Sequence, residues 1–190
     1  MRMGLVPSGG DLVFRLIYFL FSVLLHVGPA GAQDRDLLSK YRLGAGDVIS
    51  INVLGEDDLK LKVRLTDAGT IQYPVLGEIR VRGMTMGDLV KHITEGLKGR
   101  YLVDPKVTAS VDEYRPFFIN GEVYRPGGYP FVPGLTVFKA VSIAGGFKDR
   151  ASKSKMFVIR DGSSSKQREN VQLDTGVFPG DILTIEESFF

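Results

Sequence analysis

The stretch YRLGAGDVISINV, residues 41–53, combines a glycine–aspartate step with a run in which apolar and polar residues alternate. The same step returns in FPGDILTIEE, residues 178–187, where the pair Gly180-Asp181 matches the pair Gly46-Asp47. Glycine adopts a positive φ without steric cost, aspartate can bond its own backbone two residues on, and alternation with period two points one set of side chains inward. Each stretch therefore predicts a turn that begins a half-buried strand, and the two together indicate two small β-containing units.

The composition is that of an ordinary globular protein. The chain has 190 residues, 44% of them hydrophobic and 24% charged, which predicts one domain or two small ones. Its formal net charge is +2, and basic residues are interleaved with acidic ones, so nucleic acid is not an expected partner. The sequence contains no cysteine, which excludes disulfides, thiolate chemistry and zinc–cysteine sites.

The N-terminal segment, residues 1–32, has the pattern of a secretory signal peptide. Two arginines precede the apolar run LIYFLFSVLL, residues 16–25, and small residues up to Ala32 form a cleavage site before Gln33. The strongly apolar part spans about ten residues, whereas a membrane-spanning helix needs about 20. We therefore expect cleavage between Ala32 and Gln33, with an uncleaved anchor as the alternative. An exported chain without cysteine fits the bacterial periplasm better than an oxidised extracellular module.

The first unit is expected to combine a small sheet with one helix. The segments 59–65 and 104–114 alternate as half-buried strands, and residues 66–83 predict an antiparallel meander between turns. Four apolar residues then recur at helical spacing after a Thr-x-x-Asp cap, which predicts a helix over 85–98 with one apolar face. Pro116 interrupts the strand pattern, so we place the domain boundary beside it.

The second unit repeats this combination of strands and a helix. Two glycine-containing turns make the segment 117–133 a set of short strands. Thr136 caps a second helix that a pair of glycines ends, and residues 156–173 predict a hairpin around Asp161-Gly162. Together the two units predict an α+β protein with two small mixed α/β units.

The sequence offers no catalytic or metal-binding pattern. His92 stands alone on the predicted helix and is expected to be an exposed or half-packed residue. The acids Asp57-Asp58 and Asp112-Glu113 would point to opposite faces of a strand and cannot flank one glycosidic bond, although a pair from distant positions stays open. GGFK, residues 145–148, lacks the spacing of a phosphate loop and is expected to end a helix. We therefore expect no catalytic residue, no metal site and no cofactor.

Aromatic residues and arginines gather near the start of the second unit. We select Arg115, Tyr124, Arg125 and Tyr129 as candidate contacts to sugar rings or to a neighbouring subunit. Aromatic rings and guanidinium groups offer flat surfaces on which such partners stack. For each of these residues, packing into the core is the alternative interpretation.

Several motifs, taken in order, resemble one bacterial family. YRLGAGDVISINV, LTDAGTIQYPVLGEIRVRGMTMGDLVKHI and YLVDPKVTASV are similar to the polysaccharide biosynthesis/export domain of bacterial outer-membrane polysaccharide export proteins. FFINGEVYRPGGYPFVPGLTVFKAVSIAGGF and the closing GDILTI resemble the soluble-ligand-binding β-grasp (SLBB) domain that follows it in that family. The resemblance implies an export domain over residues 37–115 and a β-grasp-like domain over residues 116–187.

The resemblance implies a non-enzymatic protein of capsular or exopolysaccharide export. Such a protein forms a homo-oligomer in the periplasm, or against the outer membrane, and guides the secreted polysaccharide across the periplasm. Its implied partners are an inner-membrane polysaccharide co-polymerase and an outer-membrane channel. Two other classes stay open: a periplasmic carbohydrate-binding module, and a polysaccharide-modifying accessory protein without a transport role.

Two features depart from typical members of the family. Typical members carry a lipid-acceptor cysteine after the signal and a C-terminal amphipathic helix that forms the outer-membrane pore. The sequence contains no cysteine and closes on EESFF. We therefore expect neither an acyl anchor nor a pore-forming helix, and we expect the outer-membrane channel to be a separate protein.

Overall fold

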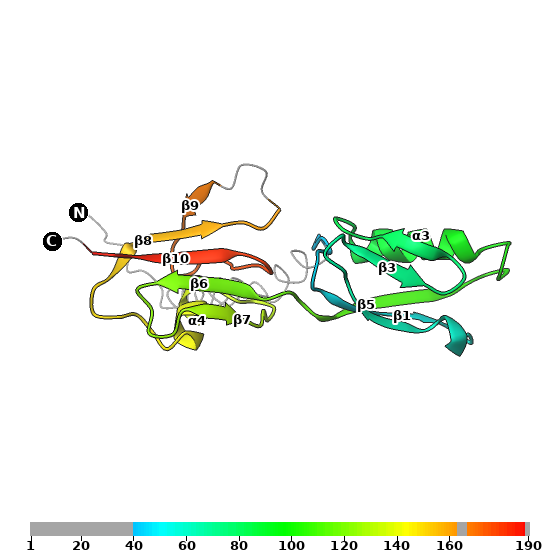
Figure 1. Ribbon diagram of the computed structural model, residues 1–190, viewed down its shortest axis with the longest axis horizontal. Helices are drawn as coiled ribbons and strands as arrows, with labels where there is room; N and C mark the ends of the chain where they lie inside the picture. The colour runs from blue at the N-terminus through cyan, green and yellow to red at the C-terminus, as the bar shows by residue number, and fades with distance from the viewer. Residues whose placement is uncertain (1–39, 163–166, 189–190) are drawn as a thin grey trace, which may run out of the picture. The chain divides into compact units, whose positions relative to one another are not determined.

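Two hydrophobic cores organise the part of the chain that the computed structural model describes, residues 40–162 and 167–188 (Figure 1). All of these residues fall in one compact unit of the chain. We call residues 41–113 the first lobe and residues 117–187 the second lobe, because each range surrounds its own core. Each lobe combines strands with an α-helix, which confirms the expected α+β class with two small mixed units.

The first lobe is built on a three-stranded antiparallel sheet. β1 (Val48–Val53) lies between β2 (Leu61–Arg64) and β5 (Val107–Glu113). Ile49 and Ile51 of β1 are fully buried, whereas Ser50 and Asn52, which alternate with them, are partly exposed. The alternation in the sequence is therefore that of an antiparallel sheet with one covered face.

A β-hairpin and a helix cover that face (Figure 1). β3 (Thr70–Tyr73) pairs with β4 (Gly77–Arg80) as a separate two-stranded sheet. Ile71, Tyr73 and Ile79 from this hairpin are buried in the same core as the inner residues of β1. The expected meander is thus a hairpin that packs on the main sheet without joining it.

The predicted helix over residues 85–98 is confirmed as α3 (Met86–Leu97). A capping box starts it, because Thr85 Oγ1 accepts a hydrogen bond from the Asp88 N–H (3.1 Å) and the Asp88 carboxylate accepts one from the Thr85 N–H (3.0 Å). Three residues at helical spacing are buried toward the sheet. They are Leu89, Ile93 and Leu97.

The second lobe is a five-stranded mixed sheet. In spatial order its strands are β7 (Gly127–Tyr129), β6 (Phe117–Gly121), β10 (Ile182–Glu187), β8 (Ala151–Ile159) and β9 (Arg168–Asn170). The last strand of the chain lies at the centre, parallel to β6 and antiparallel to β8. This insertion of the final strand between the first and third strands of the lobe is the strand order of a β-grasp sheet.

One helix, α4 (Val137–Ile143), contributes its inner side to the core of this lobe (Figure 1). Thr136 caps it as expected, since its hydroxyl accepts a hydrogen bond from the Lys139 N–H (3.4 Å). Gly145 and Gly146 follow the helix and end it. Within the described ranges, neither α3 nor α4 is long and apolar enough to cross a lipid bilayer.

One local detail of the first lobe differs from the sequence pattern. Alternation predicts a strand over residues 59–65, but Asp57–Leu59 form a single 3-10 turn and β2 begins only at Leu61. The exposed pair Asp57-Asp58 therefore lies on a helical turn and not on a strand. The pattern misled because Leu59, the buried residue of the turn, falls in phase with the apolar residues of β2.

Gly121, at the end of β6, provides a test of the packing between β6 and β10. Its φ is +86°, and an added Cβ would overlap the carbonyl oxygen of Ile185. Gly146 has a similar φ of +94°, but an added Cβ would meet nothing within 4 Å. Alanine at either position strains the backbone by roughly 1–2 kcal/mol, so we expect Gly121→Ala to lower the free energy of unfolding clearly more than Gly146→Ala. Urea denaturation measures both losses, and equal losses would contradict the close approach.

Candidate functional site

The carboxylate of Asp47, at the entry to β1, is buried and fully hydrogen-bonded. The residue is 0% exposed. Its Oδ2 accepts hydrogen bonds from the Gly44 N–H (2.8 Å), the Tyr41 hydroxyl (2.6 Å) and Arg115 Nη1 (3.0 Å), and its Oδ1 accepts one from the Arg115 N–H (2.8 Å). A buried carboxylate is unfavourable unless it is paired and hydrogen-bonded, and this one meets both conditions.

Asp181, at the entry to β10, has an equivalent environment. It is 2% exposed. Its Oδ2 accepts from the Phe178 N–H (2.8 Å) and from Arg160 Nη1 (2.6 Å), and its Oδ1 accepts from the Asp161 N–H (3.4 Å). The second carboxylate is therefore also held by one guanidinium and by backbone donors.

Apart from the Tyr41 hydroxyl, the donors come from the same two places in both sites. One is the N–H three residues before the aspartate, and the other is the end of the strand that runs antiparallel to the strand the aspartate begins. Arg115 follows β5 and Arg160 follows β8. The Arg115 guanidinium carbon lies 5.5 Å from the ring centroid of Tyr41, and that of Arg160 lies 5.2 Å from the ring centroid of Phe178. The two similar glycine–aspartate stretches of the sequence thus have similar surroundings in the structure.

The sequence predicts that each aspartate bonds the backbone two residues on, and this prediction is wrong in direction. Both carboxylates accept from an N–H three residues earlier in the chain. The reason is that the residues after each aspartate enter β1 and β10, where neighbouring strands take up the backbone N–H groups. The free donors therefore lie in the turn before the aspartate.

The backbone around the two steps differs because the neighbouring strands run in different directions. In the first lobe, Leu65 accepts a hydrogen bond from the Gly46 N–H (3.2 Å) and donates to the carbonyl of the next residue, the aspartate (2.8 Å). In the second lobe, Pro116 accepts from the Gly180 N–H (3.1 Å), and Phe118, two residues further on, donates to the aspartate carbonyl (2.8 Å). In an antiparallel pair both hydrogen bonds can go to one residue of the neighbouring strand. In a parallel pair they go to two residues of the neighbouring strand.

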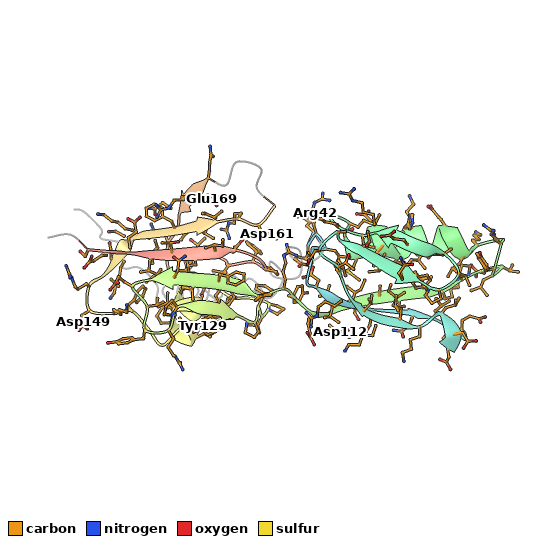
Figure 2. All side chains as sticks on the ribbon, viewed as in Figure 1. Arg42, Asp112, Tyr129, Asp149, Asp161 and Glu169 are labelled. Carbon is orange, nitrogen blue, oxygen red and sulfur yellow. The ribbon has the colours of Figure 1, made fainter. Side chains whose placement is uncertain are left out.

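Arg115 joins the two sites through Asp161. Its Nε donates to Asp161 Oδ2 at 2.8 Å, while its Nη1 reaches Asp47. Asp161 lies in the turn after β8 (Figure 2), and its own N–H donates to Asp181. One guanidinium, with 15% of its side chain exposed, therefore serves carboxylates from both lobes, and a continuous polar network runs from Asp47 to Asp181.

Two glycines leave room for this guanidinium. A Cβ added at Gly44 would lie 2.6 Å from Arg115 Nη1. A Cβ added at Gly180 would lie 2.6 Å from the Asp161 carboxylate and 2.8 Å from Arg115 Nε. Any larger residue at either position would push Arg115 or Asp161 out of hydrogen-bond distance.

Burial raises the pKa of two groups in the network. Burial raises the pKa of Tyr41, and the hydrogen bond to Asp47 acts in the same direction, while the Arg115 charge opposes both. Tyr41 therefore remains a neutral donor. Burial also raises the pKa of Asp181, against the Phe178 N–H and the Arg160 guanidinium, which favour the ionised carboxylate.

A groove of about 630 Å³ opens beside Arg115. Two further arginines, Arg42 and Arg82, line it together with the ring of Phe118 and the backbone of residues 44–46. A smaller cavity of about 290 Å³ shares Arg42 and Arg115 with it. Guanidinium groups, an aromatic ring and bare backbone in one concave surface are the elements of a ligand site, and they contain no pair of free carboxylates for acid–base chemistry.

The four predicted contact residues occupy two different places. Arg115 lies in the buried network. In the second lobe, the Tyr129 hydroxyl donates to the Arg125 carbonyl (2.6 Å), and Tyr124 is 59% exposed. Within the described ranges, no hydrogen bond or ring contact joins these three residues to Arg115. Their contact with sugar or with another subunit stays a prediction.

The remaining candidates have ordinary roles or lie elsewhere. His92 is exposed on α3. Asp112 accepts from Lys62 (2.9 Å) and Glu113 from Arg64 (2.8 Å), and these two basic residues share the exposed face of β2. The expectation that the two acids point to opposite faces is therefore wrong, because an irregularity in the pairing of β1 with β5 lies at this point. Among the residues described, no three histidine, aspartate or glutamate side chains gather as a metal site. The predicted cleavage site, Ala32 and Gln33, lies outside the described residues.

Sequence reasoning missed Tyr41, Arg160 and Asp161 as members of the site. The sequence does contain a shared feature: an arginine follows each of the strands that pair with β1 and β10 and supply the guanidinium. An arginine follows β5 in EYR, residues 113–115, and β8 in VIRD, residues 158–161. That match becomes visible only when the antiparallel pairing is known.

Removing either buried carboxylate tests how much its ion pair and hydrogen bonds stabilise each lobe. Breaking a buried pair at one partner typically costs about 3–5 kcal/mol, because the other charge stays buried. We expect Asp47→Ala and Asp181→Ala each to lower the free energy of unfolding by about that amount. Asp104→Ala, which removes an exposed partner of Lys106, should change little. Urea denaturation of the three variants checks this, and a small effect of both buried substitutions would contradict it.

Comparison with protein-family models gives two matches in tandem. Residues 36–112 match the model described as polysaccharide biosynthesis/export protein. Residues 116–168 match the SLBB domain. The first match covers most of the first lobe and Asp47, and the second covers Phe118 and Asp161.

Similar curated proteins carry consistent names. The chain is 30% identical over 146 residues to the exopolysaccharide production protein ExoF of Rhizobium meliloti, an alignment that covers 70% of this chain and 34% of ExoF. It is 28% identical over 185 residues to the EPS I polysaccharide export outer membrane protein EpsA of Ralstonia nicotianae, covering 83% of this chain and 47% of EpsA. It is 26% identical over 135 residues to the polysialic acid transport protein KpsD of Escherichia coli, covering 70% of this chain and 24% of KpsD.

The chain thus spans between a quarter and a half of the length of these relatives. Both family matches fall in the order that the sequence motifs predict. The glycine–aspartate strand at the start of the first lobe lies inside the first match. Residues 36–112 thus match a polysaccharide biosynthesis/export domain, and an SLBB domain follows it over residues 116–168.

Proposed function

We propose that this protein is a non-enzymatic component of a capsular or exopolysaccharide export machinery, and that it forms oligomers which guide the polymer across the periplasm. The observation that carries this proposal is the tandem of an export domain and an SLBB domain. Relatives named for polysaccharide production, export and transport support it. In this proposal the polymer passes to a separate outer-membrane channel, and an inner-membrane polysaccharide co-polymerase delivers it.

The chemistry of the network supports a role without catalysis. A general acid or base needs a proton or lone pair directed at a substrate. The buried carboxylates of Asp47 and Asp181 instead accept hydrogen bonds from backbone N–H groups and from arginines. These groups hold the two central strands in place, so the site favours binding over turnover.

Exposed apolar side chains on the helical side of the second lobe support self-association. Phe138 on α4 is 58% exposed, Ile143 at its end is 40% exposed, and Tyr124 is 59% exposed. An added Cβ at Gly145 would lie 3.2 Å from the Tyr124 Cβ, so this tyrosine lies beside the end of α4. Large exposed apolar side chains that lie near one another are typical of protein interfaces. We propose that subunits meet over this surface.

The proposal includes the boundaries of the signal peptide and of the two domains. We propose that the signal peptide ends at Ala32, that the export domain spans residues 37–115 and that the SLBB domain spans residues 116–187. The processed protein then acts in the periplasm or against the outer membrane. N-terminal sequencing of the exported protein tests the first of these points.

A deletion strain tests transport against the other classes of function. We expect loss of this protein to stop secretion of a polysaccharide while sugar polymerisation continues, because a guide acts after synthesis. Measurement of secreted and cell-retained polymer checks this. Normal secretion in the deletion strain would refute a transport role, and cleavage or modification of the polymer by the purified protein would show an enzyme instead.

Native mass spectrometry tests the proposed subunit surface. We expect the protein to be oligomeric, and we expect Phe138→Asp to shift it toward the monomer, because a charge would replace an apolar contact that becomes buried. Val103→Asp is the matched control, since Val103 is 90% exposed in the first lobe. A strictly monomeric protein at high concentration, with and without cell extract that contains its partners, would count against oligomerisation.

A further inference from the structure

The groove beside Arg115 carries more positive charge than the fold uses. Arg115 itself is balanced by Asp47 and Asp161. Arg42 and Arg82 line the same groove, and within the described ranges neither makes a salt bridge. Among the described residues that line the groove, Asp161 is the only carboxylate, and Arg115 already pairs with it. Two guanidinium charges are therefore available to a ligand.

Arg42 is held by a hydrogen bond to the backbone, whereas only the backbone and the stem of Arg82 have contacts among the described residues. Arg42 Nη1 donates to the Gly83 carbonyl (2.7 Å). The other N–H groups of its guanidinium make no hydrogen bond within the described residues. Hydrogen bonds from Thr85, and then the Arg42 charge, lower the pKa of the nearby Asp88 carboxylate, which forms no salt bridge with Arg42 in the described ranges.

The N–H of Arg82 donates to the Gly69 carbonyl (3.0 Å), and the Arg82 stem packs against Gly69. The Arg82 guanidinium makes no hydrogen bond within the described residues. A guanidinium fork is suited to a carboxylate, because it can donate two parallel hydrogen bonds.

The remaining surface of the groove suits a flat, weakly apolar ring. Phe118 is 46% exposed, and its ring edge lies against Gly128, where an added Cβ would come within 2.9 Å of it. The absence of a side chain at Gly128 thus leaves room for the ring. The glycine turn at residues 44–46 and the backbone at Gly180 leave space for a ring to approach. The volume of about 630 Å³ lies in the usual range of ligand pockets, roughly 300–1,000 Å³.

We propose that this groove binds a carboxylate-bearing sugar of an acidic polysaccharide, with Arg42 and Arg82 contacting the carboxylate and Phe118 contacting the sugar ring. The class of ligand rests on the proposed export function, whereas the carboxylate preference rests on the two arginines that make no salt bridge within the described ranges. A neutral sugar would leave both guanidinium groups without a salt bridge. The surface offers too few basic residues to follow a nucleic acid backbone, since the whole chain has a formal charge of only +2.

Calorimetric titration of the purified protein with trigalacturonate tests the proposal. We expect binding of trigalacturonate, and at least about tenfold weaker binding of its methyl ester, which is the same sugar without charge. The double variant Arg42→Gln/Arg82→Gln should lose about tenfold or more in affinity for trigalacturonate. Phe118→Ala should weaken both the acid and its ester, because the ring contact does not depend on charge.

Charge-matched controls separate a site from general attraction. Arg80→Gln/Lys91→Gln removes two positive charges from exposed positions of the same lobe outside the groove. We expect this variant to bind trigalacturonate as the wild type does. An equal loss in both double variants would overturn the proposal, as would equal binding of the methyl ester or no binding of trigalacturonate at millimolar concentration. Sulfated maltotriose distinguishes the anion: binding as tight as that of trigalacturonate would overturn the carboxylate preference.

A secretion assay keeps the proposal distinct from the proposed function. If the groove is wrong but the export function is right, the deletion strain fails to secrete polymer while Arg42→Gln/Arg82→Gln restores normal secretion. If the export function is wrong but the groove is right, the deletion strain secretes normally while the purified protein still binds trigalacturonate through Arg42 and Arg82. We expect neither outcome: the deletion should block secretion, and the double variant should restore it only in part.

Discussion

A buried aspartate at the start of the central strand is the constraint on which each lobe depends. Asp47 directly precedes β1 and Asp181 directly precedes β10, and each strand lies between two others in its sheet. An ionised carboxylate is stable there only with a cation and further donors. In both lobes the cation comes from the residues that follow an antiparallel neighbour, β5 for β1 and β8 for β10, so the ion pair is compatible with this pairing.

Arg115 extends this constraint from one lobe to the other. Its guanidinium meets Asp47 on one side and Asp161 on the other, whereas the equivalent Arg160 pairs with Asp181 and with Glu169 (3.3 Å) inside its own lobe. The geometry needs bare backbone at Gly44 and Gly180, because a Cβ would occupy the space of the guanidinium. The same bare backbone forms part of the groove wall. The requirement that buries Arg115 thus also creates concave surface beside it.

Local patterns predicted the elements of this fold, and long-range pairing produced the site. The capping box at Thr85 and the spacing of the apolar residues identified α3, and the glycine–aspartate steps identified β1 and β10. In contrast, Arg115 lies 68 residues from Asp47 and 46 residues from Asp161. No periodicity or turn signal reports contacts at such separations, because they depend on the β-grasp strand order and on which strand ends meet. The direction of the aspartate hydrogen bonds was mispredicted for the same reason, since strand pairing uses the donors that follow.

The arginines that would contact a ligand are exposed, whereas the most buried ones are already paired, and this arrangement favours weak binding over tight binding. A guide for a long polymer must bind each segment strongly enough to direct it and weakly enough to release it. The buried arginines are fully used, so they stabilise the fold and add little attraction for a ligand. Arg42 and Arg82 are exposed, and salt screens exposed charges, so each contact is modest and readily broken. In an oligomer the same weak groove would recur on every subunit, and repeated weak contacts hold a polymer without fixing any one segment. Weak individual binding is therefore a requirement of the proposed role and not an argument against it.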